Sequence, residues 1–186
     1  MRLLTLLLLL CTSGFALHYN TLQLNAETII FPKLLLLKKH PESLLIDGRI
    51  RFGVVYEAED RDIASQLVSR LQRLYRGTIE GYPFEATMLQ YREIGPETKA
   101  SALLMLHSET QMHQAAAFAK AHGIVTFAYN TASLKYGLLF ALGIERTTRV
   151  YLNREALSGY GIEFSESLYQ IVRFVDGTAE TGLAPK

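Results

Sequence analysis

The sequence of 186 residues holds one cysteine, Cys11, and no tryptophan. Cys11 lies in a leader that we expect to be removed, so the mature chain can form no disulfide of its own and must be held together by a hydrophobic core. A thiol-based redox switch and a thiolate metal site are excluded for the same reason. The ten tyrosines and nine phenylalanines are an ordinary supply of core residues.

The leader is the segment "MRLLTLLLLLCTSGFA", residues 1–16. Arg2 supplies a positive start, an apolar run follows, and Gly14 and Ala16 stand at the −3 and −1 positions of a plausible cleavage site. We therefore expect a cleaved secretory signal peptide and export of the mature chain. The run is shorter than the about 20 apolar residues of a membrane-spanning helix, so we expect no span after cleavage. An uncleaved anchor is the weaker alternative.

The chain also lacks an excess of charge. Removal of Arg2 leaves 18 basic and 18 acidic residues, and no run of five or more like charges is present. No global field would draw such a protein to nucleic acid, and we expect no nucleic-acid partner.

Catalytic signatures are missing as well. The sequence contains no G-x-S-x-G elbow, no Walker A sequence and no G-x-G-x-x-G after a strand. Without cysteine, covalent catalysis would need a serine or threonine, and none stands in a recognisable setting. We expect a protein that is not an enzyme and has no cofactor; a hydrolase is a disfavoured third alternative.

Residues 17–176 are enough for one domain with a hydrophobic core. Short apolar runs typical of buried strands alternate with amphipathic segments, which predicts βα units. The expected elements are a helix over about Pro32 to Lys39, a strand around residues 50–55, a helix over about Asp60 to Tyr75 closed by Gly77, strands around 83–94 and 100–107, a helix from a Ser108/Gln111 capping box to about His122, and a strand around 124–130.

The pattern changes near the end of the chain. "GLLFALG" and "TRVYLN" are too close for a helical crossover and predict an antiparallel pair, with Val150 and Leu152 on one face and Tyr151 on the other. We expect a turn next and then a final helix, before a flexible tail at 177–186. The turn would use Asn153, Ser158, Gly159 and Gly161, and the helix would bury Phe164, Leu168, Ile171, Val172 and Val175. The predicted fold is a single three-layer α/β/α domain whose mostly parallel sheet carries an antiparallel hairpin near the C-terminus.

Two polar clusters could form sites. Glu57, Glu59, Asp60 and Asp62 follow the first strand, where open α/β sheets bind ligands, but a helix cap with acids near the positive helix end is the favoured interpretation.

His107, Glu109 and His113 carry atoms that zinc accepts. They do not place two histidines on one helix face, so a capped helix with solvent-facing histidines is favoured, and we expect no metal site.

The last third also resembles a known family. It contains a glycine-preceded strand "YGLLFALG", a strand "RVYLN" ending in asparagine, a small-residue turn "REALSGYG" and a segment "IEFSESLYQIVRFV". With "IRFGVVYEAEDRDIASQL" and "ALLMLHSETQMHQAAAFAKAHGIVTFAYN", these stretches resemble the YfiR-like periplasmic proteins from about Ile50 to Val175. Better-known members carry cysteines that take part in redox sensing, and the mature chain here has none.

The resemblance implies a non-enzymatic regulator that binds and represses an inner-membrane sensor, a diguanylate cyclase, and so lowers cyclic di-GMP output. Such control would work by differential affinity for the partner's inactive state. Arg154, Tyr160 and Glu163 are the exposed residues of the last third that we expect at a partner interface. Self-association as a homodimer is a further expectation.

The alternative function is binding of a small ligand in a cleft lined by the acidic and histidine-bearing loops at the strand ends. Substrate-binding proteins related to amino-acid transport show a similar order of strands and helices, although they are longer and two-lobed.

Overall fold

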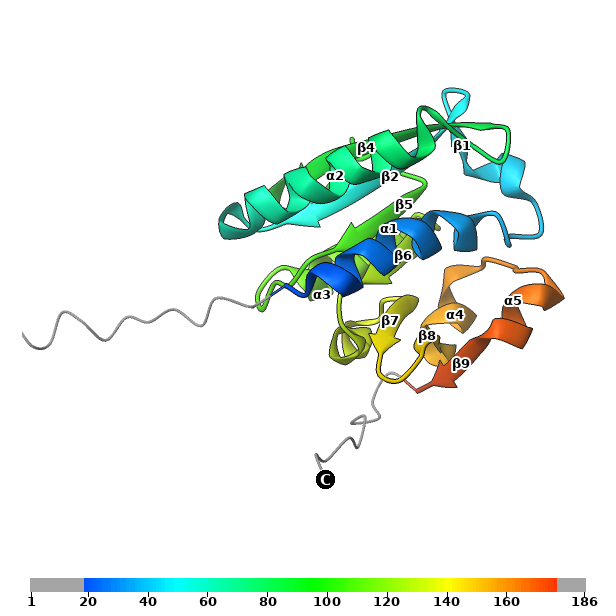
Figure 1. Ribbon diagram of the computed structural model, residues 1–186. Coiled ribbons are helices and arrows are strands. Elements are labelled where there is room, and N and C mark those ends of the chain that lie inside the picture. Colours follow the sequence, from blue (N-terminus) through cyan, green and yellow to red (C-terminus); the bar gives the residue numbers. More distant parts are fainter. Residues whose placement is uncertain (1–18, 177–186) are drawn as a thin grey trace, which may run out of the picture.

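The computed structural model describes residues 19–176, which form one sheet with helices on both faces (Figure 1). The predicted signal peptide and the predicted tail lie outside the described residues. The elements are α1 (Thr21–Leu35), η2 (Pro41–Leu44), β1 (Leu45–Ile46), β2 (Arg49–Tyr56), η3 (Ala58–Asp60), α2 (Arg61–Tyr75), β3 (Thr78–Ile79), β4 (Tyr82–Gln90), η4 (Tyr91–Glu93), β5 (Ala102–Met105), α3 (Met112–Ala121), β6 (Val125–Ala128), η5 (Thr131–Tyr136), β7 (Phe140–Ile144), β8 (Thr148–Asn153), α4 (Arg154–Tyr160), α5 (Glu166–Ile171) and β9 (Val172–Val175), where η denotes a 3-10 helix.

The sheet has the strand order β3-β4-β2-β5-β6-β7-β8-β9, and β1 pairs with β2. Strands β4, β2, β5, β6 and β7 run parallel to one another, and β3 pairs with β4 in antiparallel fashion. The β7–β8 pair is antiparallel, with Ala141 opposite Tyr151. The predicted α/β fold with a mostly parallel sheet and a hairpin near the end is therefore confirmed.

Each central strand contributes side chains to both faces of the sheet. Val54 and Leu104 belong to the core beneath α1 and α2, whereas Val55 and Leu103 belong to the core beneath α3. Helix α5 extends the α1/α2 layer toward β9, α3 lies behind the sheet with η5, and α4 contacts α3 (Figure 1). Strands buried on both faces explain the continuous apolar runs in the sequence.

Helix α1 begins eleven residues before the predicted start at Pro32, so that prediction was wrong. Asn20 caps the helix by accepting hydrogen bonds from the backbone N–H groups of Leu22 (2.8 Å) and Gln23 (3.4 Å). Pro32 lies in the last turns and cannot donate to the carbonyl four residues earlier.

That carbonyl, of Thr28, accepts a hydrogen bond from the hydroxyl of Tyr75 in α2 at 3.2 Å, and the next one, of Ile29, lies 3.1 Å from the same hydroxyl. A side chain from the neighbouring helix thus satisfies the backbone group that the proline leaves free, and this makes Pro32 compatible with a helix interior.

The crossover from β4 to β5 has no α-helix. Parallel strands are usually joined through a helix that covers the sheet, but residues 91–101 supply only η4 and a loop. The loop lies on the α3 face, because Tyr91 and Ile94 pack into the core beneath α3. The space beside α3 is therefore lined by a loop in place of a second helix.

The segment after β8, residues 154–176, differs from the prediction. The expected turn after β8 is helix α4, which Asn153 caps by accepting from the Ala156 backbone N–H at 3.1 Å. The expected single helix is split into α5 and the strand β9, which pairs in parallel with β8. Phe164 precedes both and forms an isolated bridge to Lys38. Within residues 19–176, no helix is long and apolar enough to cross a membrane.

Candidate functional site

The strand order places a topological switch point between β2 and its neighbours. From β2 the chain runs to β4 on one side and then returns to β5 on the other. In open α/β sheets, ligands bind at the carboxyl ends of the strands where the winding direction changes. The segments that meet there are residues 57–62 after β2, 91–96 after β4 and 106–111 after β5.

Glu57 is the centre of a hydrogen-bond network at this edge. Its carboxylate accepts from the Ser108 hydroxyl at 2.6 Å and from the Gln111 side-chain amide at 3.1 and 3.2 Å. Ser108 also accepts from the Gln111 backbone N–H at 3.0 Å, which is one half of the predicted capping box. The other half is absent because the Gln111 side chain turns to Glu57, and α3 begins only at Met112.

Tyr19 fills the crevice beside this network. Its hydroxyl donates to Asp60 at 2.6 Å and accepts from the His107 backbone N–H at 3.3 Å. Its ring lies against Tyr129, with centroids 4.7 Å apart. Burial raises the pKa of the Asp60 carboxyl, an effect that the Tyr19 hydrogen bond opposes, and burial together with Asp60 raises the pKa of Tyr19. Tyr19, two residues before α1, thus joins the segments after β2 and β5 at the central part of the switch point.

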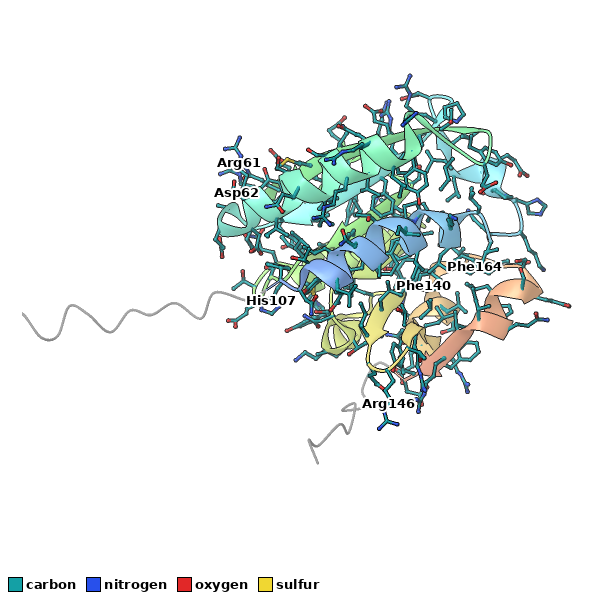
Figure 2. The ribbon with its side chains drawn as sticks, viewed as in Figure 1. Arg61, Asp62, His107, Phe140, Arg146 and Phe164 are labelled. Carbon is teal, nitrogen blue, oxygen red and sulfur yellow. The ribbon has the colours of Figure 1, made fainter. Side chains whose placement is uncertain are left out.

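The two predicted polar clusters do not assemble into a metal site. Among residues 19–176, no group of three or more potential ligands could hold a metal ion. Asp60 stands at the N-cap position of α2, but its side chain makes no capping hydrogen bond and binds Tyr19 instead. Figure 2 shows His107 at a distance from Asp62. Glu59, Asp62, Glu109 and His113 are exposed.

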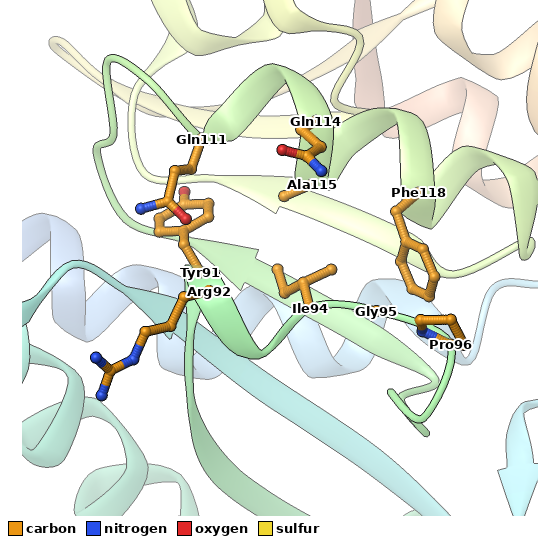
Figure 3. Close-up of a pocket in the computed structure, with 9 residues that line it drawn as sticks. All are labelled: Tyr91, Arg92, Ile94, Gly95, Pro96, Gln111, Gln114, Ala115 and Phe118. Atoms are coloured by element: carbon orange, nitrogen blue, oxygen red, sulfur yellow. The ribbon is translucent and has the colours of Figure 1, made fainter.

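A pocket of about 370 Å³ lies next to the Glu57 network, between η4 with its following loop and α3. In Figure 3, side chains from α3 and the residue before it face the loop, and Arg92 extends away toward the rim. The lining residues are Tyr91, Arg92, Ile94, Gly95, Pro96, Gln111, Gln114, Ala115 and Phe118.

Local hydrogen bonds fix the shape of this loop. The Glu93 carboxylate accepts from the backbone N–H of Gln90 at 2.7 Å, and Gly95 donates to the Thr98 hydroxyl at 2.9 Å. Tyr91 is anchored beneath the pocket by a hydrogen bond to the Leu106 carbonyl at 2.5 Å, and burial raises the pKa of its hydroxyl. The Tyr91 hydroxyl is therefore a structural donor, and the Gln111 side-chain nitrogen is bound to Glu57. The side-chain oxygen of Gln111 and the amide of Gln114 are the polar groups that these bonds leave for a ligand.

The three residues predicted at a partner interface have different environments. Arg154 is exposed, with its guanidinium 4.9 Å from the centre of the Phe174 ring. Glu163 is exposed and pairs with Lys39 at 2.7 Å. Tyr160 is buried and its hydroxyl is 2.9 Å from that of Thr126, so its prediction as an exposed residue was wrong. A turn predicted over residues 154–160 would leave Tyr160 exposed. These residues instead form a helix, and Tyr160 lies on its inner face.

The sequence interpretation missed the pocket itself. Gln111, Gln114 and Phe118 have helical spacing, which indicates a common face. The short β4–β5 connection containing Gly95 and Pro96 was the other available signal, because it is too short to hold a helix of ordinary length. Neither signal shows that the loop folds against that face of α3.

Comparison with known proteins gives similarity at the level of fold. No protein-family model matches the chain, and no curated protein matches it. Among solved structures, a conserved domain protein from Vibrio cholerae O1 biovar El Tor aligns with a TM-score of 0.56 and 12% identity over 81% of this chain. An ABC domain in complex with L-Trp from Streptococcus pneumonia aligns with a TM-score of 0.50 and 11% identity over 77%. The chain spans 59% of the length of each, and at this identity both are similar in fold alone.

Proposed function

We propose that this protein is a non-enzymatic binding protein that takes a small amphipathic ligand, of the size of an amino acid or a small organic acid, in the pocket between η4 and α3. The observation that carries the proposal is the composition of that pocket. Amide groups from Gln111 and Gln114 stand beside the apolar surface of Phe118 and Ile94, and Arg92 supplies a cation at the rim. Small-ligand sites combine apolar walls with a few polar groups in this way.

The size and the chemistry of the pocket both support binding over catalysis. Its volume of about 370 Å³ is within the range of ligand sites, roughly 300–1,000 Å³. Its lining contains no carboxylate, imidazole or thiol, and its one hydroxyl, on Tyr91, is bound to the Leu106 carbonyl. These groups can orient a ligand but supply neither a nucleophile nor a general base.

The positive charge of Arg92 narrows the ligand to molecules that carry an acidic group. The guanidinium group of Arg92 is a cation that favours a carboxylate. Phe118 offers a ring face to an apolar or aromatic group. One solved structure of similar fold is described as a complex with L-Trp, so aromatic amino acids are the first ligands to test.

The test is calorimetric titration and thermal shift with a panel of amino acids and their decarboxylated amines. A carboxylate ligand should raise the melting temperature saturably, whereas the matching amine should not. Phe118→Ala and Gln114→Ala should each weaken binding about tenfold or more. His113→Ala, an exposed change on the same helix outside the pocket, is the control. Binding that is equally strong in Phe118→Ala would refute this location.

A second function, repression of an inner-membrane diguanylate cyclase as the YfiR-like resemblance implies, is favoured by a separate surface. Tyr169, Ile171 and Phe174 are exposed at the end of the sheet, and the rings of Tyr169 and Phe174 stack at 6.0 Å. Exposed apolar groups at an edge strand commonly mark contacts with other proteins. Arg154, one of the predicted partner residues, adds a cation over Phe174.

This second function predicts loss of partner binding when that surface is made polar. Ile171→Ser together with Phe174→Ser should abolish co-purification with a membrane signalling protein and raise cyclic di-GMP. Leu22→Ser, at an exposed leucine in α1, is the matched control and should change neither. Recovery of no such protein with the unaltered chain, along with unchanged cyclic di-GMP on gene deletion, would reject the regulator function.

A further inference from the structure

A second concave region lies on the opposite face of the sheet from the η4/α3 pocket. It is a groove of about 630 Å³ between α1 and α2, two helices of the layer that covers the other core. The groove is lined by Asn25, Thr28 and Ile29 of α1 and by Arg70, Arg73 and Leu74 of α2. We call it the α1/α2 groove.

The α1/α2 groove combines apolar surface with positive charge. Ile29 and Leu74 are exposed by 47% and 51%, which is high for large aliphatic side chains. Arg70 and Arg73 bring two guanidinium groups, and within residues 19–176 neither forms an ion pair. The only acidic residue of α1, Glu27, is fully buried and does not face the groove.

One nitrogen atom of Arg70 has no hydrogen-bond acceptor among the described residues. This atom, Nη1, is buried. A buried N–H group without a partner is costly, and more so on a charged group. Arg70 as a whole is only half-buried, so a ligand oxygen can reach its guanidinium from the accessible side. Guanidinium groups bind carboxylate and phosphate oxygens with charge-assisted hydrogen bonds.

We infer that the α1/α2 groove binds a single-chain amphiphilic anion, with its acidic head on Arg70 and Arg73 and its alkyl chain along Ile29 and Leu74. The volume is within the usual range of ligand sites. Each CH₂ group of a buried alkyl chain adds a similar favourable increment, so the affinity should rise with chain length. This site goes beyond the proposed function, since it shares no residue with the η4/α3 pocket.

The experiment uses three probes on the protein that starts at residue 17. Dodecanoate carries both the charge and the chain, dodecanol only the chain, and acetate only the charge. Below its micellar concentration, dodecanoate should bind saturably in calorimetry and shift backbone amide signals of α1 and α2 in NMR spectra. Dodecanol should bind at least tenfold more weakly, and acetate should give no saturable signal. Equal binding of dodecanol and dodecanoate would overturn the inference.

Variants then locate the site. Arg70→Met keeps the apolar stem and removes the charge, so it should weaken dodecanoate binding at least tenfold, and Leu74→Ser should do the same by removing chain contacts. Arg61→Met, an exposed change at the start of α2, is the control and should bind as the unaltered protein does. Unchanged affinity in Arg70→Met, with the fold verified by circular dichroism, would also overturn the inference.

Vesicles distinguish the source of the anion. Co-sedimentation with phosphatidylcholine vesicles that carry lysophosphatidylglycerol, absent without it and lost in Arg70→Met, would identify a single-chain membrane lipid. Dodecanoate binding without co-sedimentation would identify a free fatty acid. Amino-acid binding in the η4/α3 pocket is measured separately, so failure of one site leaves the result for the other unchanged.

Discussion

Glu27 is the residue whose environment departs most from that of an ordinary surface carboxylate. Its side chain is fully buried, one oxygen accepts from the Gln23 amide at 3.1 Å, and the other has no partner among the described residues. Burial raises the pKa of Glu27 well above its usual value, and the Gln23 hydrogen bond only partly opposes this. The carboxyl group is therefore held in a site that favours its protonated form.

This environment predicts a stability that falls as pH rises. Below pH 4.5, the ordinary value, Glu27 is protonated in both the folded and unfolded states and its site costs least. Between pH 4.5 and the higher pKa of the folded state, the unfolded chain releases the Glu27 proton while the folded protein keeps it. Stability is therefore lost as pH rises through the folded-state pKa. Glu27→Gln removes this titration, so it should stabilise the protein at pH 8 by about 1–3 kcal/mol.

Urea unfolding at pH 5 and pH 8 checks the prediction. The loss of free energy of unfolding between the two pH values should be smaller in Glu27→Gln than in the unaltered protein. Glu59→Gln, at an exposed position in η3, is the control and should leave the loss unchanged. Asp60 also has a raised pKa, but it is present in all three proteins and cancels in the comparison. An undiminished loss in Glu27→Gln would contradict the assignment.

At the scale of elements, the sequence was most informative where burial follows a simple period. Helix α2 was predicted within one residue of its observed start, because Ile63, Leu67, Leu71 and Leu74 repeat at helical spacing and Gly77 follows the helix with positive φ. The buried strands were predicted for the same reason, whereas the β7–β8 hairpin followed from a connection too short for a helical crossover. In the helix and the buried strands one kind of contact, with the core, determines the residue pattern.

The elements that the sequence did not predict are those in which a contact with another segment outweighs the periodic pattern of apolar residues. In α1 the buried face contains the polar residues Glu27 and Thr28, so it does not show the apolar pattern of an amphipathic helix. Pro32 is compatible with this helix because the Tyr75 hydroxyl, from α2, binds the carbonyl that the proline leaves free. At the end of the chain, Leu168 and Val172 have helical spacing. However, the Val172 N–H closes the helix on the Leu168 carbonyl, and the next residues pair with β8.

The candidate site was predictable only in its general place. The carboxyl edge of the sheet follows from the order of strands and helices, and Glu57 and Ser108 were both noted at that edge. Their mutual hydrogen bond, the closure of the crevice by Tyr19 and the loop packed against Phe118 all depend on contacts between segments distant in sequence. Side-chain type and local spacing do not specify such contacts.

At the scale of the whole molecule, the two proposed sites lie on opposite faces of one sheet. The η4/α3 pocket stands over the core that contains Val55 and Leu103, and the α1/α2 groove stands over the core that contains Val54 and Leu104. Adjacent residues of the same strand therefore belong to different cores. Loss of either core would remove the packing that holds β2 and β5 in register.

We therefore expect the domain to unfold as one cooperative unit. Because the chain has no tryptophan, a single introduced tryptophan reports on one face alone. Tyr82→Trp reports on the α1/α2 side and Tyr136→Trp on the α3 side, both at half-buried positions. Each fluorescence transition in urea should have the same midpoint and slope as the transition seen by circular dichroism in the same variant. Separate midpoints for fluorescence and circular dichroism in either variant would show instead that the two layers unfold independently.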